Sequence, residues 1–199
     1  MKKAEKVLEL AREQGVLRAR DLASHGIPRE YLVRLVQQGL LVRQSRGLYT
    51  LADQPMSPHH TLAQVAARVP DAVICLLSAL SYHDLTTQQP FQVWLALPEK
   101  SRRPKLEYPP LRVCLFSQSA FRAGVEAHDI EGRQVKIYSP AKTVADCFKY
   151  RNKIGLDVAL EALQDAWRKR RVSMHELEKY AEICRVSRVM RPYLEALVA

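Results

Sequence analysis

The spacing of hydrophobic residues changes several times over the first 52 positions, and each change predicts a new element. Apolar residues recur at helical spacing over residues 2–14 and again over residues 32–36. Two short apolar runs, at residues 40–42 and 48–51, flank the polar, glycine-ended segment 43–47, which is typical of a β-hairpin. In order, the predicted elements are a helix at residues 2–14, a short strand or linker at 16–17, helices at 21–25 and 27–38, and a hairpin at 40–51.

Glycine and proline positions agree with these boundaries. Gly15, Gly26 and Gly39 each follow a predicted helix, where glycine readily adopts the left-handed conformation that ends helices. Pro28 is expected in the first turn of the third helix, where its missing N–H costs nothing. Three helices and a hairpin predict a winged helix-turn-helix domain over residues 1–53. In this fold the third helix enters the major groove of DNA, and the hairpin contacts the backbone or the minor groove.

The pattern changes after a linker expected at residues 53–58. Helical spacing returns at 59–69, and the apolar run 72–80 fits a strand entering a short helix, although spacing alone does not separate the two. Further strands are expected at 91–97 and 111–116, a hairpin at 125–138 that turns at Gly132, and helices at 140–150, 156–168 and 173–198. Residues 58–199 are therefore predicted to form an α+β domain with a mostly antiparallel sheet and C-terminal helices.

The distribution of charged residues indicates what kind of partner the predicted winged helix binds. The chain carries 31 Lys and Arg against 21 Asp and Glu, and residues 1–52 hold ten of the bases but only five of the acids. Half of the net charge of +10 therefore lies on the predicted winged helix, which indicates nucleic acid as a partner. The expected DNA contacts are Arg29, Tyr31 and Arg34 on the third helix, Arg43, Gln44, Ser45 and Arg46 at the wing, and Arg18 before the second helix. The alternative is a protein-interaction module whose surface arginines are only solvated.

Other basic groups leave two interpretations open. Arg18 and Arg20 precede the second helix, whose N-terminal dipole favours a phosphate, but simple solvation explains them equally well. Residues 168–171 end a helix, where cations suit the negative end of the dipole. A proline-bounded loop carries a further exposed group of cations, Lys100, Arg102, Arg103 and Lys105. The last two clusters are either a secondary contact with nucleic acid or a partner, or helix caps and solubilising charges.

Little in the sequence indicates catalysis, a metal or a membrane. The four cysteines lie 33–39 residues apart without a CxxC pair, so we expect buried, reduced thiols and no metal site. P-loop, GxGxxG and GxSxG motifs are absent from the sequence, and we expect neither cofactor nor enzymatic activity. A metal-dependent nuclease using acids such as Asp146 is the enzymatic alternative. Without an apolar run of about 18 residues or a signal peptide, the chain is expected to be cytoplasmic.

Three segments resemble the AbiEi family of abortive-infection antitoxins. They are the wing at residues 42–49 (VRQSRGLY), residues 77–85 (LSALSYHDL), and residues 135–148 (VKIYSPAKTVADCF). The chain departs from the family at Asp84, where glycine is frequent, and at Lys142, where arginine is frequent. The order and spacing of the segments make the resemblance more specific than any one of them.

The resemblance implies a transcriptional repressor that binds inverted repeats in its own promoter. It also implies that the C-terminal domain counters a toxin of the nucleotidyltransferase class, without a stable complex being required. Under this resemblance Arg34, Arg43 and Arg46 contact DNA, and structural roles fall to Ser139, Pro140, Thr143 and Asp146. The non-enzymatic alternative is a stand-alone winged-helix regulator whose second domain binds a partner or small molecule.

Overall fold

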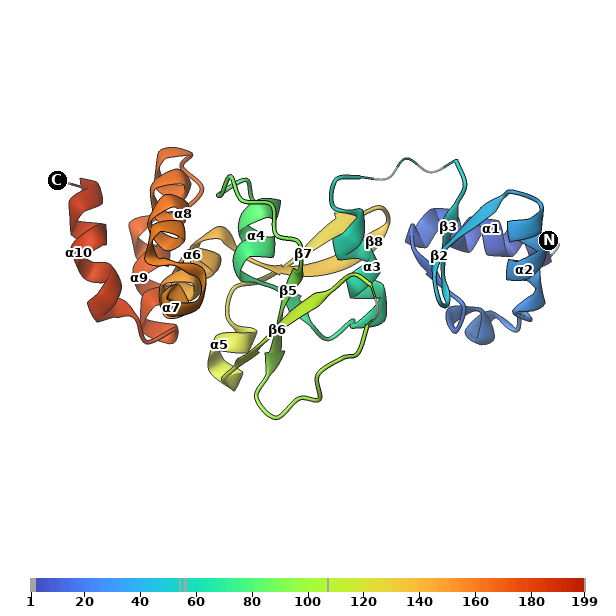
Figure 1. Ribbon diagram of the computed structural model, residues 1–199, viewed down its shortest axis with the longest axis horizontal. Coiled ribbons are helices and arrows are strands. Elements are labelled where there is room, and N and C mark those ends of the chain that lie inside the picture. Colours follow the sequence, from blue (N-terminus) through green and yellow to red (C-terminus); the bar gives the residue numbers. More distant parts are fainter. Residues whose placement is uncertain (1–2, 54, 56, 107, 199) are drawn as a thin grey trace. The chain divides into compact units, whose positions relative to one another are not determined.

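Two compact units make up the chain in the computed structural model, which describes residues 3–53, 55, 57–106 and 108–198 (Figure 1). Unit 1 comprises residues 1–70 and 128–135, and unit 2 comprises residues 71–127 and 136–199. Gln54 and Met56 of the expected linker lie outside the described residues.

Unit 1 contains three helices and a three-stranded sheet in the order that the sequence predicts. The helices are α1 (Lys3–Gln14), the 3-10 helix η1 (Asp21–His25) and α2 (Glu30–Gln37). The strands β1 (Leu17–Arg18), β2 (Leu41–Ser45) and β3 (Leu48–Leu51) form an antiparallel sheet in the order β1-β3-β2. One hydrophobic core joins them, with Leu10, Leu32 and Leu35 at its centre. The winged helix-turn-helix architecture expected for the first quarter of the chain is confirmed.

Two boundaries within the winged helix differ from the expectation. Helix α2 begins at Glu30, so Pro28 precedes the helix instead of occupying its first turn. Strand β2 continues through Ser45, with an irregularity in register after Arg43, and the turn is reduced to Arg46 and Gly47. Gly47 has a φ of 76°, which lets the chain reverse within two residues.

Unit 1 is completed by a helix and a turn from later in the chain. Helix α3 (His60–Arg68) follows the winged helix, and the turn at Glu131 and Gly132 lies between β7 (Val125–Ile130) and β8 (Arg133–Tyr138). A Cβ built on Gly15 would lie 1.4 Å from the carbonyl oxygen of Glu131. The turn therefore approaches the end of α1 so closely that only glycine fits there.

A five-stranded sheet in the order β6-β5-β4-β8-β7 organises the rest of the chain. The additional strands are β4 (Val73–Ile74), β5 (Val93–Pro98) and β6 (Leu111–Phe116). β4 pairs antiparallel with β5, but it runs parallel to β8, and β5 runs parallel to β6. The α+β class is confirmed, with a sheet more mixed than expected, because β6 starts beside the first residue of β5, with Leu111 opposite Val93, and so runs parallel to it.

Helices pack around this sheet and supply most of the core of unit 2. They are α4 (Leu76–Tyr82), α5 (Gln118–Arg122), α6 (Pro140–Lys149), α7 (Arg151–Ile154), α8 (Leu156–Arg168), α9 (Met174–Ile183) and α10 (Ser187–Val198). Helix α6 is buried along most of its length. The single helix expected over 173–198 is two helices, because the chain breaks at Arg185, whose φ is 58°. Helix α5 had no counterpart among the predicted elements.

Two details of unit 2 match the sequence-based expectations. Ser139 caps α6 by accepting a hydrogen bond from the backbone N–H of Lys142, and Pro140 occupies the first turn. All four cysteines are buried thiols without disulfide bonds. None of the helices within the described residues is both long and apolar enough to cross a bilayer.

Candidate nucleic-acid interface

Helix α2 has one face in the core of the winged helix and one in solvent. Leu32 and Leu35 are buried, whereas Arg34 is exposed and Val33 is exposed to 56%. Tyr31 is half-buried and packs against the core. The solvent face thus combines a guanidinium with an apolar side chain, the groups that recognise guanine edges and thymine methyls in a major groove.

The four polar residues of the wing divide into two pairs. Gln44 donates a 3.0 Å hydrogen bond to the Oγ1 of Thr50 on the neighbouring strand, and the Ser45 hydroxyl accepts a hydrogen bond from Arg68. Arg43 and Arg46 are exposed. The structure therefore uses the uncharged pair to hold the wing together and leaves the two guanidinium groups accessible to a ligand.

Five arginines surround one hollow of about 310 Å³ in unit 1. They come from the segment before η1, the start of α2, the wing turn and the end of α3, and they are Arg18, Arg20, Arg29, Arg46 and Arg68. Of the residues that the structure describes, no Asp or Glu lines the hollow. Within the described residues, Arg18 is the one member that pairs with a carboxylate, that of Asp21 at 2.8 Å. So many cations around one concavity suit the phosphates of a nucleic-acid backbone.

Arg18 and Arg68 also fix the walls of the hollow. Arg18 donates to the carbonyl oxygen of Ala67 at 3.0 Å, and Arg68 donates to the Ser45 hydroxyl at 2.7 Å and to the carbonyl oxygen of Arg46 at 2.6 Å. The Nε of Arg68 is buried and has no hydrogen-bond partner within the described part of the chain. Helix α3 is thereby tied to both the wing and β1.

The β7–β8 turn holds α3 from the other side. The carboxylate of Glu131 is bonded to Nδ1 of His60 at 2.6 Å and accepts a hydrogen bond from the backbone N–H of Ser57 at 2.7 Å. Burial opposes ionisation of this carboxyl, but the bonds from His60 and Ser57 outweigh it and hold the pKa of Glu131 below its usual range. An ionised, hydrogen-bonded carboxylate therefore joins α3 to the turn that covers Gly15.

Arg133, just after this turn, adds another cation near the hollow. Its guanidinium donates to the carbonyl oxygen of Val16 at 2.5 Å. Burial lowers the pKa of Arg133, and the charge of Arg18 lowers it further. The carboxylate of Asp21, which pairs with Arg18, opposes this lowering of the pKa of Arg133.

The residues expected from sequence to contact DNA are thus placed unevenly. Arg29, Arg34, Arg43 and Arg46 are exposed, whereas Arg18, Tyr31, Gln44 and Ser45 are partly buried in the scaffold. Sequence reasoning missed Arg68 and Val33. Val33 could have been found, because it lies off the apolar face of the predicted helix. No sequence signal links Arg68 to a wing more than twenty residues earlier.

In unit 2 the cations of the proline-bounded loop are exposed; they are Lys100, Arg102, Arg103 and Lys105. Residues 168–171 are also exposed, and there Lys169 donates to the carbonyl oxygen of Asp84. Asp84 has a φ of 57°, the left-handed conformation that glycine adopts without strain. The departure from glycine at this position is thus accompanied by a contact from Lys169, the residue that follows α8.

Three side chains of the types that can act in catalysis, those of Ser78, His83 and Asp146, have partners that point to structural roles. The Ser78 hydroxyl accepts from the backbone N–H of Trp94 at 2.9 Å, and Nε2 of His83 is bonded to the carbonyl oxygen of Tyr138 at 2.7 Å. Asp146 is 1% exposed and is bonded to Lys142 and to the thiol of Cys184. Among the described residues, no group of three or more His, Cys, Asp and Glu side chains is arranged to hold a metal.

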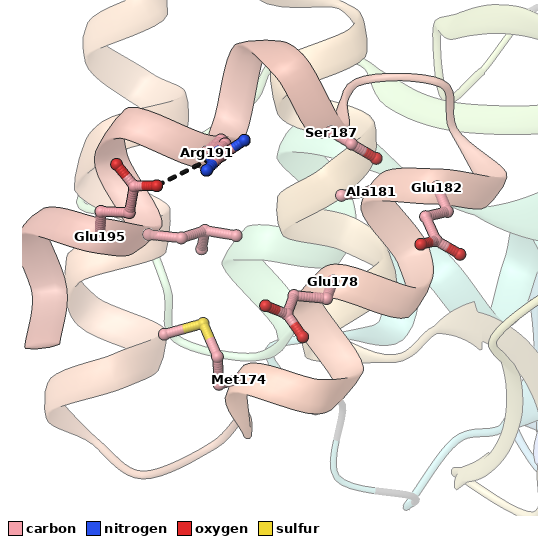
Figure 2. Close-up of a pocket in the computed structure, with 8 residues that line it drawn as sticks. Met174, Glu178, Ala181, Glu182, Ser187, Arg191 and Glu195 are labelled. Atoms are coloured by element: carbon pink, nitrogen blue, oxygen red, sulfur yellow. Dashed lines mark hydrogen bonds and ion pairs between the residues drawn. The ribbon is translucent and has the colours of Figure 1, made fainter.

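A hollow of about 590 Å³ between α9 and α10 has the opposite charge (Figure 2). Its lining combines the apolar side chains of Met174, Ala181 and Leu194 with the carboxylates of Glu178, Glu182 and Glu195. The single arginine there, Arg191, is paired with Glu195 at 2.8 Å. This surface would repel a phosphate backbone, so the candidate interface is confined to the basic surfaces.

Comparison with known proteins supports the winged helix specifically. No curated protein matches the sequence. The fold is similar to that in the crystal structure of the RV2827C protein from Mycobacterium tuberculosis, with a TM-score of 0.58 and 17% identity over 90% of this chain and 71% of that chain. Residues 5–52 match the family described as transcriptional regulator, AbiEi antitoxin. The resemblance to AbiEi antitoxins is thus confirmed for the segment that carries α2 and the wing.

Proposed function

We propose that the chain is a sequence-specific DNA-binding repressor that also acts as the antitoxin of an AbiE-like pair. The observation that carries the proposal is the hollow of five arginines, four of them on a winged helix that matches AbiEi regulators and the fifth, Arg68, on α3. It unites the start of η1, the start of α2 and the wing turn, the elements that approach DNA in this fold.

In this proposal α2 lies in the major groove, with Arg34 and Val33 facing base edges. The hollow takes a backbone phosphate between Arg20, Arg29 and Arg46, beside the start of α2. Arg43 follows the backbone or a narrow minor groove next to the wing. Tyr31, Gln44 and Ser45 then hold α2 and the wing in place, and the arginines make most of the contacts with DNA.

The regulated DNA would be the chain's own promoter, with inverted repeats as the bound sites. The toxin would be a nucleotidyltransferase, countered through unit 2 without a stable complex. The proposed role involves no cofactor, metal or catalysis by this chain, and it places the chain in the cytoplasm, where the promoter lies. These points are supported by the family described for residues 5–52 and by the resemblance of residues 77–85 and 135–148.

Fluorescence anisotropy tests the DNA-binding role directly. The full chain is titrated against a labelled duplex from its own upstream region and against a scrambled duplex, at several salt concentrations. We expect tighter binding to the upstream duplex and a steep linear fall of log affinity with log salt, because phosphate contacts release counterions. Equal affinity for both duplexes at every salt concentration would show that the chain is not a sequence-specific repressor.

The antitoxin role needs a separate measurement. The neighbouring gene, if it encodes a nucleotidyltransferase, is expressed from an inducible promoter with and without this chain. We expect growth arrest with the neighbour alone and rescue when the chain is supplied from a second, unrelated promoter. Arrest that persists despite normal levels of the chain would leave a repressor without antitoxin activity.

A further inference from the structure

A second basic hollow, of about 590 Å³, lies in unit 2 along β6. Strand β6 is at the edge of the five-stranded sheet (Figure 1). Three cations line it: Arg103 from the loop before β6, Arg112 on β6, and Lys153 on α7. Among the residues that the structure describes, no Asp or Glu lines this hollow. Within the described residues, none of the three cations forms an ion pair with a carboxylate. The hollow therefore presents cations whose charge is not balanced by its own walls.

Aromatic rings hold two of these cations in place. The guanidinium carbon of Arg112 lies 5.6 Å from the ring centroid of Trp94, and Nζ of Lys153 lies 5.4 Å from that of Tyr150. Tyr150 is itself fixed, because its hydroxyl donates to the carbonyl oxygen of Leu115 at 3.2 Å and its ring stacks on Phe116. The two cations are therefore positioned before any ligand arrives, which lowers the entropy lost on binding.

The field of these cations is felt at the floor of the hollow. Cys114, which lines it, is hydrogen-bonded to the thiol of Cys75, and this bond is the main cause that lowers the pKa of Cys114. Burial opposes the effect, whereas the charges of Lys153 and Arg112 add to it. The charges of Lys153 and Arg112, which come from different elements, thus both favour negative charge at this position of the lining, whereas the charge of Asp146 opposes it.

We propose that this hollow binds a free nucleoside di- or triphosphate. Three cations without acidic partners match the charge of a pyrophosphate group, and Arg112 and Arg103 offer the paired N–H donors that bind phosphate oxygens. The guanidinium of Arg112, held near the Trp94 ring, is also a planar group of the kind that stacks on a base. The volume is within the range of about 300–1,000 Å³ typical of small-ligand sites.

This ligand goes beyond the proposed repressor function and does not depend on it. The residues that hold it belong to unit 2, whereas the DNA contacts proposed above belong to unit 1. Arg112→Ala is therefore expected to leave affinity for the upstream duplex unchanged. Loss of nucleotide binding and loss of DNA binding can therefore be detected independently, so either proposal can fail while the other holds.

Isothermal titration calorimetry of the full chain with ATP tests the proposal. We expect ATP to bind, inorganic tripolyphosphate to bind more weakly because it lacks the base, and adenosine to give no measurable heat. Arg112→Ala and Lys153→Ala should each weaken ATP binding at least about tenfold, since each removes a charge-assisted contact. Arg112→Lys should be intermediate, because it keeps the charge but loses the planar group.

Arg188→Ala, an exposed arginine on α10, is the matched control and should bind ATP like the native chain. Thermal unfolding with and without ATP shows whether each variant is folded and whether the ligand stabilises it. Absence of ATP binding at millimolar concentration would overturn the proposal, as would equal affinity in folded Arg112→Ala and Lys153→Ala. A single-stranded oligonucleotide that binds through Arg112 and is not displaced by ATP would overturn it in favour of a nucleic-acid contact.

Discussion

Arg68, the last residue of α3, donates a 2.7 Å hydrogen bond to the hydroxyl of Ser45 at the end of β2. The same nitrogen donates to the carbonyl oxygen of Arg46, the residue at the wing turn. The wing is thus positioned by a residue beyond the segment that matches AbiEi regulators. It follows that α3 is part of the scaffold of the proposed DNA-binding surface, although it is not part of the helix-turn-helix itself.

Replacing Arg68 tests this link. Arg68→Ala removes one cation of the hollow and frees the wing turn, and we expect affinity for the upstream duplex to fall about tenfold, the effect of losing one charge-assisted contact. Arg68→Lys keeps the charge but loses the forked geometry, so its affinity for the duplex should lie between those of the native chain and Arg68→Ala. Anisotropy titration measures the effect, with Arg12→Ala on the exposed side of α1 as the control. Native affinity in Arg68→Ala would remove α3 from the interface.

Arg34 and Arg46 are expected to contribute in different ways. Arg34→Ala should cost about 1–3 kcal/mol and reduce the preference for the upstream duplex over a scrambled one, because a base contact is lost. Arg46→Ala should weaken binding to both duplexes alike and reduce the slope of log affinity against log salt by about 1, because a phosphate contact is lost. Unchanged affinity in both variants would place the interface elsewhere on the chain.

The elements of this interface could be predicted from sequence because local signals define them. Helical spacing at residues 32–36 and the paired apolar runs around Gly47 depend only on neighbouring residues. The roles of individual side chains depend on tertiary contacts. Gln44 and Ser45 look like solvent-facing polar residues in the sequence, yet Thr50 and Arg68 engage them in the folded chain.

The same distinction explains the differences in unit 2. Whether β6 runs parallel or antiparallel to β5 depends on how the chain connects the two strands. The spacing of hydrophobic residues carries no information about that connection. The break at Arg185 lies in a segment whose apolar spacing is helical on both sides, and no glycine or proline marks it. The hollow along β6 could not be predicted from the sequence either, because its three cations are as much as 50 positions apart in the chain.

Comparing alanine substitutions at Gly15 and Gly26 separates the contact between α1 and the β7–β8 turn from backbone strain. Both have a φ near +60°, so alanine is strained at either position, by about 1 kcal/mol. At Gly26 a Cβ meets nothing within 4 Å, whereas at Gly15 it would collide with the carbonyl oxygen of Glu131. We expect Gly15→Ala to lower the free energy of unfolding by roughly 1–3 kcal/mol more than Gly26→Ala. Equal effects in urea denaturation would mean that the turn does not rest on Gly15.

The Glu131 carboxylate gives unit 1 a defined dependence on pH. A carboxyl whose pKa is lowered by folding stabilises the folded state above its unfolded pKa, and this contribution is lost as the pH falls through its folded value. Compared with Glu131→Gln, the native chain should be more stable by about 1–2 kcal/mol at neutral pH, with the difference shrinking below about pH 4.5. Urea denaturation of both proteins across this range measures the difference. A gap that is constant with pH would exclude an ionised Glu131 as its source.

Lys142 and Asp146 form an ion pair inside α6, with Nζ and Oδ2 2.5 Å apart and side chains 0% and 1% exposed. The ammonium group also lies 4.1 Å from the ring centroid of Tyr138. Burial raises the pKa of Asp146, and Lys142 opposes that rise, so each charge depends on the other for compensation. The surroundings of Asp146 are those of a structural charge, which argues against its use in metal-dependent nucleic-acid cleavage.

Asp146→Ala separates the structural role from the enzymatic alternative. It leaves the Lys142 charge buried without a partner, and we expect unfolding to become easier by about 3–5 kcal/mol. The double variant Lys142→Met with Asp146→Leu should regain most of that loss, because apolar groups of similar volume carry no desolvation penalty, and methionine packs well against Tyr138. The folded double variant should also still bind the upstream duplex. If the native chain cleaves DNA or RNA with a divalent metal and the folded double variant does not, Asp146 is catalytic and the non-enzymatic function is wrong.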